Sequence, residues 1–185
     1  PTLFLSHGAP DFVLTDHIAT SALKKLGKQL ALPKAIVIVS AHWISSPIGI
    51  TASASHKMIY DFSGFPEALY QLSYPAKGDP ELATQIGKML QTAGFSINLD
   101  KERGLDHGAW VPLMLIYPGA EIPVIQVSLP KGGFKECARL GEALAPLHDQ
   151  GILIIGSGGS VHNLRAMNRR NQTDVWAKKF EYWSQ

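Results

Sequence analysis

The sequence predicts an α/β fold in which a central, mostly parallel or mixed sheet lies between two layers of helices. Short apolar segments alternate with longer amphipathic ones along the 185 residues, and no internal repeat or low-complexity tract interrupts the alternation. Several short segments are apolar throughout, as expected of strands that are covered on both faces. We therefore expect one domain of three-layer α/β/α architecture.

Each predicted element is supported by its local pattern. Six short apolar segments bounded by turn-forming residues are expected to be strands: residues 2–6, 35–40, 48–52, 95–99, 124–129 and 152–156. Five amphipathic segments are expected to be helices: residues 20–31, 79–93, 110–117, 134–148 and 173–183. Residues 60–78 are dense in aromatic residues, glycine and proline, and predict a long functional loop with a short helix at 67–72.

Charge and composition favour a small-molecule partner. The 17 Lys and Arg residues nearly balance the 15 Asp and Glu residues, and no basic block occurs, so we expect binding neither to nucleic acid nor to an anionic membrane. The longest apolar runs are far too short to span a bilayer. Cys137 is the single cysteine, which excludes an intramolecular disulfide and a cysteine-based zinc site and favours the cytoplasm.

Three histidines share one position relative to the predicted strands. His7, His42 and His162 each come just after the C-terminal end of an apolar strand. Ligands of open α/β sheets bind beyond the carboxyl ends of the strands, so parallel strands would bring these imidazoles to one cleft. Imidazole is a common ligand of zinc and iron, and the pattern predicts a metal site. The alternative is that each histidine is a structural one, bonded to nearby backbone.

His107 differs because it opens a helix. A helix N-terminus disfavours the imidazolium ion, so a neutral His107 is a candidate base or hydrogen-bond donor. Asp106 would bond an imidazole nitrogen or cap the helix. Asp61 would accept a hydrogen bond from a ligand histidine or form a local turn. The other histidines, His17, His56 and His148, are interpreted as structural.

Aromatic residues near these histidines suggest two further interpretations. Trp43, Phe62, Phe65 and Trp110 would form a slot for a flat ring or pack in the core. The segment GSGGS at residues 156–160 lacks the spacing of a phosphate-binding loop and of a nucleophile elbow, which disfavours nucleotide binding and serine hydrolysis.

Six motifs in register resemble one family. They are SHGAP around His7, SAHW around His42, YDFSGFPEALYQLSYPAKGDPELA at residues 60–83, GLDHGAW around His107, IPVIQVSLP at residues 122–130 and GSGGSVHNLR around His162. Together they resemble the DOPA-dioxygenase-like branch of the class III extradiol ring-cleaving dioxygenases, over essentially the whole chain.

The resemblance implies a three-layer domain that holds a non-haem Fe(II), or Zn(II) as found in relatives handled aerobically. By motif, His7, His42 and His162 look like the metal-site histidines. His107 looks like the residue that contacts substrate and transfers protons. The implied substrates are a catechol and O₂, and the implied product is a muconic semialdehyde.

The sequence departs from the family pattern at two places. Tyr60 stands where many members have a histidine before Asp-Phe. Family members also continue past residue 185 and supply a further metal ligand there, so we expect residues 1–185 to be a single dioxygenase-like domain that lacks its C-terminal portion. Two alternatives remain at this point: a zinc-dependent hydrolase that uses a metal-bound water, and a catalytically inactive binding protein on the same scaffold. The sequence specifies no oligomeric state.

Overall fold

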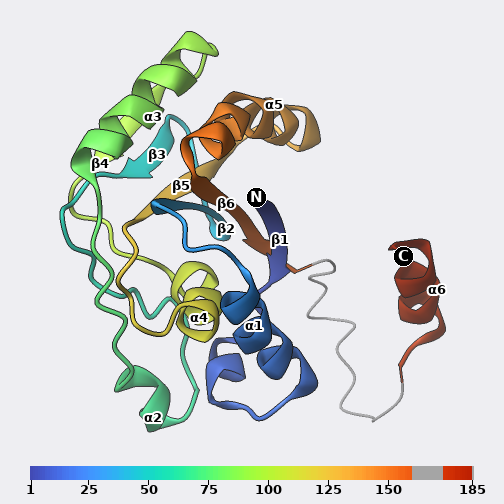
Figure 1. Ribbon diagram of the computed structural model, residues 1–185. Helices are drawn as coiled ribbons and strands as arrows, with labels where there is room; N and C mark the ends of the chain where they lie inside the picture. Colours follow the sequence, from blue (N-terminus) through green and yellow to red (C-terminus); the bar gives the residue numbers. More distant parts are fainter. Residues whose placement is uncertain (160–172, 185) are drawn as a thin grey trace.

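A computed structural model describes residues 1–159 and 173–184 of the chain (Figure 1). All six predicted strands form, and they make one sheet in the order β1-β6-β2-β5-β3-β4. Their bounds are β1 (Thr2–Ser6), β2 (Ala35–Ser45), β3 (Ile48–Thr51), β4 (Ile97–Asp100), β5 (Val124–Pro130) and β6 (Ile152–Gly158). The predicted elements therefore occur in the expected order.

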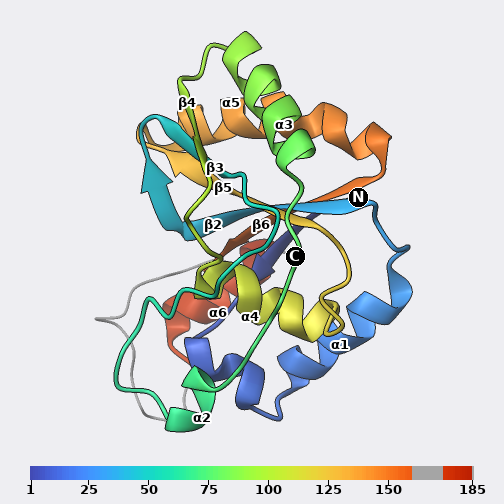
Figure 2. The same ribbon diagram turned by 90° about the vertical axis from the view of Figure 1, so that its left-hand side faces the viewer.

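Helices cover both faces of this sheet, which confirms the three-layer prediction. Figure 2 shows α3 and α5 on one face, with α1 and α4 on the other. The helices are α1 (Ile18–Gln29), α2 (Glu67–Tyr70), α3 (Pro80–Thr92), α4 (His107–Ile116), α5 (Phe134–Leu144) and α6 (Val175–Ser184). Two 3-10 helices, η1 (Pro10–Leu14) and η2 (Ala145–Gln150), complete the described elements, and η1 was not expected from the sequence.

The sheet is mixed, and its parallel part defines one edge. Strands β1, β6, β2 and β5 are parallel neighbours, whereas β3 pairs with β5 in the antiparallel direction. Ser6 at the end of β1 pairs with Gly158 of β6, and Ser40 of β2 pairs with Ser157. The carboxyl ends of these strands therefore lie side by side, as the histidine pattern requires.

Each face of the sheet carries its own apolar cluster. Ile36 and Ile38 of β2 are fully buried on the face covered by α4, together with Trp110. Val37, between them, is buried on the opposite face with Ile125 of β5. This alternation follows from the two-residue period of a strand, which sends successive side chains to opposite faces. Two covered faces explain why residues 35–39 of β2 are apolar without interruption.

Strand β2 is longer than predicted, and its end is irregular. Ser40 pairs with Ser128 of β5, but the next pairing residue of β2 is Ile44, which pairs with Leu129. The intervening residues, including His42, have no counterpart on β5 and form a bulge. The prediction that His42 follows the end of the strand is therefore wrong, because β2 resumes after the bulge. A bulge re-aims the side chains within it, and such bulges occur beside active sites.

Several helix boundaries differ from the prediction, among them the start of α4 at His107 rather than residue 110, and two have clear local reasons. Helix α1 starts at Ile18 because the ring Nδ1 of His17 accepts a hydrogen bond from the backbone of Ala19 at 3.2 Å, which confirms a structural role for this histidine. Helix α5 ends at Leu144 and continues as a 3-10 helix. Pro146 lacks the N–H that would extend the α-helical ladder.

The last described helix presents apolar side chains to solvent. Helix α6 confirms the predicted helix, but Val175, Trp176 and Trp183 are exposed, with Trp183 at 79%. Figure 1 shows α6 apart from the rest of the domain. Within the described ranges, no helix combines the length and apolar character needed to cross a membrane.

Candidate metal centre

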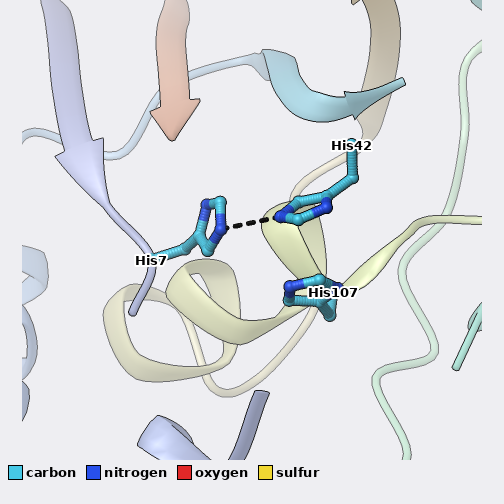
Figure 3. Close-up of side chains that lie close together, drawn as sticks. All are labelled: His7, His42 and His107. Carbon is cyan, nitrogen blue, oxygen red and sulfur yellow. Dashed lines mark hydrogen bonds between the residues drawn. The ribbon is translucent and has the colours of Figure 1, made fainter. Parts of the chain in front are cut away.

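Three histidines converge at the carboxyl edge of the parallel strands (Figure 3). His7 follows β1, His42 lies in the bulge of β2, and His107 is the first residue of α4. The Nε2 atoms of His7 and His42 lie 2.9 Å apart. The centroid of the His107 ring lies 4.0 Å from that of His42 and 5.3 Å from that of His7. One nitrogen of each ring lies within 4.8 Å of the others.

The site is shielded from solvent on two sides. His7 is 2% exposed and His107 is 5% exposed, whereas His42 is partly open. The Nδ1 atom of His7 lies 3.0 Å from the hydroxyl of Ser157, at the end of β6. This contact holds the His7 ring so that its Nε2 faces His42.

Asp61 from the long aromatic loop holds His107. Its Oδ1 accepts a hydrogen bond from the ring Nδ1 of His107 at 2.8 Å and another from the His107 backbone N–H at 3.1 Å. A carboxylate only accepts, so the proton of the neutral ring lies on Nδ1, and Nε2 keeps its lone pair. Burial raises the pKa of Asp61, but its hydrogen bonds with His107 outweigh this effect, so the pKa of Asp61 lies below its ordinary value. Asp61 therefore acts as an acceptor for a site histidine.

Asp106 has a role that the sequence did not reveal. Its side chain makes no helix-capping bond, so the capping role is wrong, and among the described residues it makes no hydrogen bond to an imidazole. The fully buried carboxylate instead accepts hydrogen bonds from Ser40 at 2.7 Å, from Gln126 and from Arg103 at 3.3 Å. The Ser40 hydroxyl in turn accepts a hydrogen bond from the backbone N–H of His42 at 3.1 Å. Asp106 thus supports the bulge that carries His42.

The remaining histidines lie elsewhere or outside the described residues. His56 is buried, and its Nε2 lies 2.8 Å from the carbonyl oxygen of Val124, a structural role as predicted. His148 is largely exposed beside Asp149. His162 falls outside the described residues, so its place in the metal site stays a prediction.

Of the four aromatic residues weighed for a flat-ring slot, Phe62 lies at the site. Its ring meets that of His107 edge-on at 5.7 Å between centroids, and the ring of Phe65 meets that of Phe62 edge-on at 5.3 Å. Trp110 is fully buried in the core. The guanidinium carbon of Arg103 lies 4.2 Å from the centroid of the Trp43 ring. The aromatic loop therefore supplies one apolar wall beside His107.

The donor set suits a borderline or soft divalent metal. Two imidazole nitrogens that both bind an ion at about 2.1 Å lie at most about 4.2 Å apart. The 2.9 Å between the Nε2 atoms of His7 and His42 is within this limit. Nitrogen donors of this kind are those preferred by zinc and iron rather than by magnesium or calcium.

A separate cavity of about 920 Å³ lies beside α5 over β1 and β6. Its walls are mostly apolar and include Phe4 and Leu140, and His42 and Ser157 line it as well. His7 and His107 do not line it. This cavity therefore touches the histidine cluster from the α5 side of the sheet.

Comparison with known proteins points to one family. The family described as the catalytic LigB subunit of aromatic ring-opening dioxygenase matches residues 2–185. A 4,5-DOPA dioxygenase extradiol of Escherichia coli K12 is 44% identical over 97% of this chain and 67% of its own length. A protein of the same name from Beta vulgaris is 43% identical over 98% of this chain and 70% of its own length. The crystal structure of an uncharacterized E. coli K12 protein superposes with a TM-score of 0.76 at 37% identity, covering 98% of this chain and 70% of that one.

Proposed function

Since this chain belongs to the family of the catalytic LigB subunit of aromatic ring-opening dioxygenases, we propose that His7 and His42 hold the metal with which it opens a catechol ring. The family and the names of its relatives support an extradiol dioxygenase over the hydrolase and the inactive binding protein. The observation that carries the proposal is the convergence of the two Nε2 atoms at the carboxyl edge of the sheet.

We propose Fe(II) as the working metal, with Zn(II) able to occupy the same donors. When bound, Fe(II) supplies redox chemistry that lets dioxygen react with a catechol. His162 is proposed as a third ligand, on its motif. The chain spans 67% and 70% of two relatives, and we propose that a further ligand lies outside these 185 residues.

We propose a catechol of the DOPA type as substrate, together with O₂. The names of several relatives, which are 4,5-DOPA dioxygenases, support this class. Phe62 offers an apolar edge beside His107, against which an aromatic ring can pack. The near-neutral charge balance supports a small molecule rather than nucleic acid or membrane, and the lone cysteine supports a cytoplasmic location.

We propose that His107 transfers the substrate proton. Its Nδ1 is engaged with Asp61, and a neutral ring then has a lone pair on Nε2 that can accept a proton from a catechol hydroxyl. The negative charge of Asp61 stabilises the imidazolium that forms. His107 then holds that proton beside the reacting ring and can return it to the opened product.

An oxygen electrode tests the proposed substrate class. The protein is loaded with Fe(II) without oxygen and then mixed with DOPA in air. We expect consumption of one O₂ per DOPA and the appearance of a yellow semialdehyde, because a dioxygenase places both oxygen atoms in its product. Oxygen uptake that yields a quinone and no ring-opened product would reject the proposal.

A further inference from the structure

A proline inside α4 leaves one backbone carbonyl without its helical partner. In an α-helix the N–H of residue i donates to the carbonyl of residue i−4, so residue 112 would serve the carbonyl of Gly108. Residue 112 is Pro112, which has no N–H to donate. The Gly108 carbonyl is buried within the first turn of α4, directly after His107. A buried carbonyl without a donor is unfavourable, so another donor is required.

Ser157 supplies that donor from the sheet. Its hydroxyl donates a hydrogen bond to the carbonyl oxygen of Gly108, between residues 49 positions apart in the sequence. Ser157 is 3% exposed and lies at the end of β6, where its backbone pairs with Leu5 and Ser40. A serine hydroxyl carries a single proton. Its donation to Gly108 leaves only lone pairs for other contacts.

The hydrogen bond that Ser157 donates to Gly108 determines which ring nitrogen of His7 carries the proton. The ring Nδ1 of His7 lies 3.0 Å from the hydroxyl oxygen of Ser157. The hydroxyl proton of Ser157 points to the carbonyl oxygen of Gly108, so the hydroxyl oxygen can only accept a hydrogen bond from His7. The Nδ1 atom of His7 must therefore be the donor. In a neutral imidazole with Nδ1 protonated, Nε2 carries a lone pair. This is the nitrogen that lies 2.9 Å from Nε2 of His42.

We propose that Ser157 is a positioning residue that fixes the tautomer of His7 for metal binding. Pro112 contributes because it leaves the carbonyl of Gly108 free to accept the hydroxyl proton of Ser157. We call the chain of hydrogen bonds from Gly108 through Ser157 to His7 the relay. The use of this tautomer rests on the proposed metal site, whereas the tautomer itself rests on the contacts alone. The relay also connects β6 to the first turn of α4, next to His107. It therefore couples the ring orientation at His7 to the helix that carries His107.

The tautomer is measured directly in the metal-free protein. Long-range ¹⁵N–¹H correlation spectra of ¹⁵N-histidine-labelled protein, recorded near pH 8 where histidine is neutral, distinguish a protonated ring nitrogen from an unprotonated one. We expect His7 with Nδ1 protonated in the wild type. The Ser157→Ala variant removes the acceptor and should shift His7 toward the Nε2-protonated form. Assignment comes from the loss of one signal in His7→Gln.

Metal affinity gives a second readout, with Zn(II) as the probe. Ser157→Ala should weaken Zn(II) binding by about 10- to 100-fold, the usual loss when the partner of a ligand histidine is removed. Pro112→Ala leaves Ser157 in place but adds an N–H that competes for Gly108. We expect it to move the His7 tautomer in the same direction by a smaller amount, because a carbonyl oxygen accepts two bonds.

Ser128→Ala is the matched control. Ser128 is also a fully buried serine of a parallel strand, but its hydroxyl contacts Ser45 and Gly49. The Ser128→Ala variant should leave the His7 spectrum and the Zn(II) affinity unchanged. A wild-type His7 protonated on Nε2, or a Ser157→Ala variant with unchanged tautomer and affinity, would overturn the relay. A wild type with the expected tautomer that binds no Zn(II) would support the relay and reject the proposed metal site.

Discussion

Asp61 and His107 are joined twice, because one carboxylate oxygen accepts both the ring Nδ1–H at 2.8 Å and the backbone N–H at 3.1 Å. The backbone bond satisfies an N–H of the first turn of α4, which has no partner within the helix. The ring bond sets which nitrogen of His107 faces the other two histidines. A single loop residue thus fixes both the start of the helix and the orientation of its first side chain.

Replacing Asp61 should therefore affect catalysis more than folding. We expect Asp61→Ala to lower turnover of DOPA by about 10- to 100-fold, because the ring loses its orienting partner. Asp61→Asn keeps an oxygen that accepts both hydrogen bonds but removes the charge, so it should lower turnover less than Asp61→Ala does. Steady-state kinetics check this. Asp149→Ala, at an exposed carboxylate, is the control. Equal activity of Asp61→Ala and the wild type would show that His107 needs no such partner.

His107 should act on substrate rather than bind the metal. We expect His107→Ala to lower turnover by about 10²- to 10⁴-fold, the range for loss of a general acid or base, with metal content close to that of the wild type. Metal analysis of the purified variant decides between the two roles. Because the ring nitrogens of His107, His7 and His42 lie within 4.8 Å of one another, a variant that loses its metal would identify His107 as a ligand.

His56 should make the fold sensitive to acid. Burial lowers the pKa of His56 more than its bond to the carbonyl of Val124 raises it, so the folded state disfavours the proton that the unfolded state accepts near pH 6.5. The stability that His56 contributes is complete above that pH and is lost as the pH falls toward the lower, folded-state pKa. Among the described atoms its Nδ1 has no hydrogen-bond partner that would accept the added proton.

Urea unfolding of the wild type and of His56→Gln at pH 7.5, 6.0 and 5.0 checks this prediction. Glutamine keeps a donor for Val124 but does not titrate, so the variant should lose less stability on acidification than the wild type. His148→Gln, at a largely exposed histidine, should follow the wild type. Parallel pH profiles for the wild type and His56→Gln would contradict the prediction.

Gly108 should tolerate no side chain. A Cβ there would lie 2.4 Å from the hydroxyl oxygen of Ser40 and 3.0 Å from a ring carbon of His42. We expect Gly108→Ala to destabilise the fold by about 1–3 kcal/mol, as overpacking does, and to weaken metal binding by displacing His42. In Gly141→Ala the new Cβ meets no atom within 4 Å, and the helical site should gain up to about 1 kcal/mol. Urea unfolding of both variants provides the comparison, and equal stability would refute the close approach.

The sequence predicted the sheet well because its signal is local. Uninterrupted apolar runs such as residues 35–39 identify strands that are covered on both faces. The strand ends predicted that His7, His42 and His162 would meet, and His7 and His42 do lie together. The bulge at His42 was missed because it depends on pairing with β5, which no local pattern of β2 records.

The partners of the site histidines were harder to predict. Ser157 contacts His7 across 150 residues, and Asp61 contacts His107 across 46. The Ser157 contact follows from strand order and register rather than from spacing. Asp61 was expected to accept from a site histidine, but its spacing did not identify His107 as the partner. Pro112 within a predicted helix was a local signal, since a proline beyond the first turn of a helix leaves the carbonyl four residues earlier without its helical donor. The side chain that donates to this carbonyl, Ser157, can be identified only once β6 is placed beside β2.

We propose that His7 and His42 hold the metal of this dioxygenase. The most direct test is a crystal structure of the Zn(II)-loaded protein with anomalous diffraction data collected at the zinc edge. We expect one strong anomalous peak with the Nε2 atoms of both histidines about 2.0–2.1 Å away. A metal bound elsewhere, or one that contacts neither His7 nor His42, would contradict it.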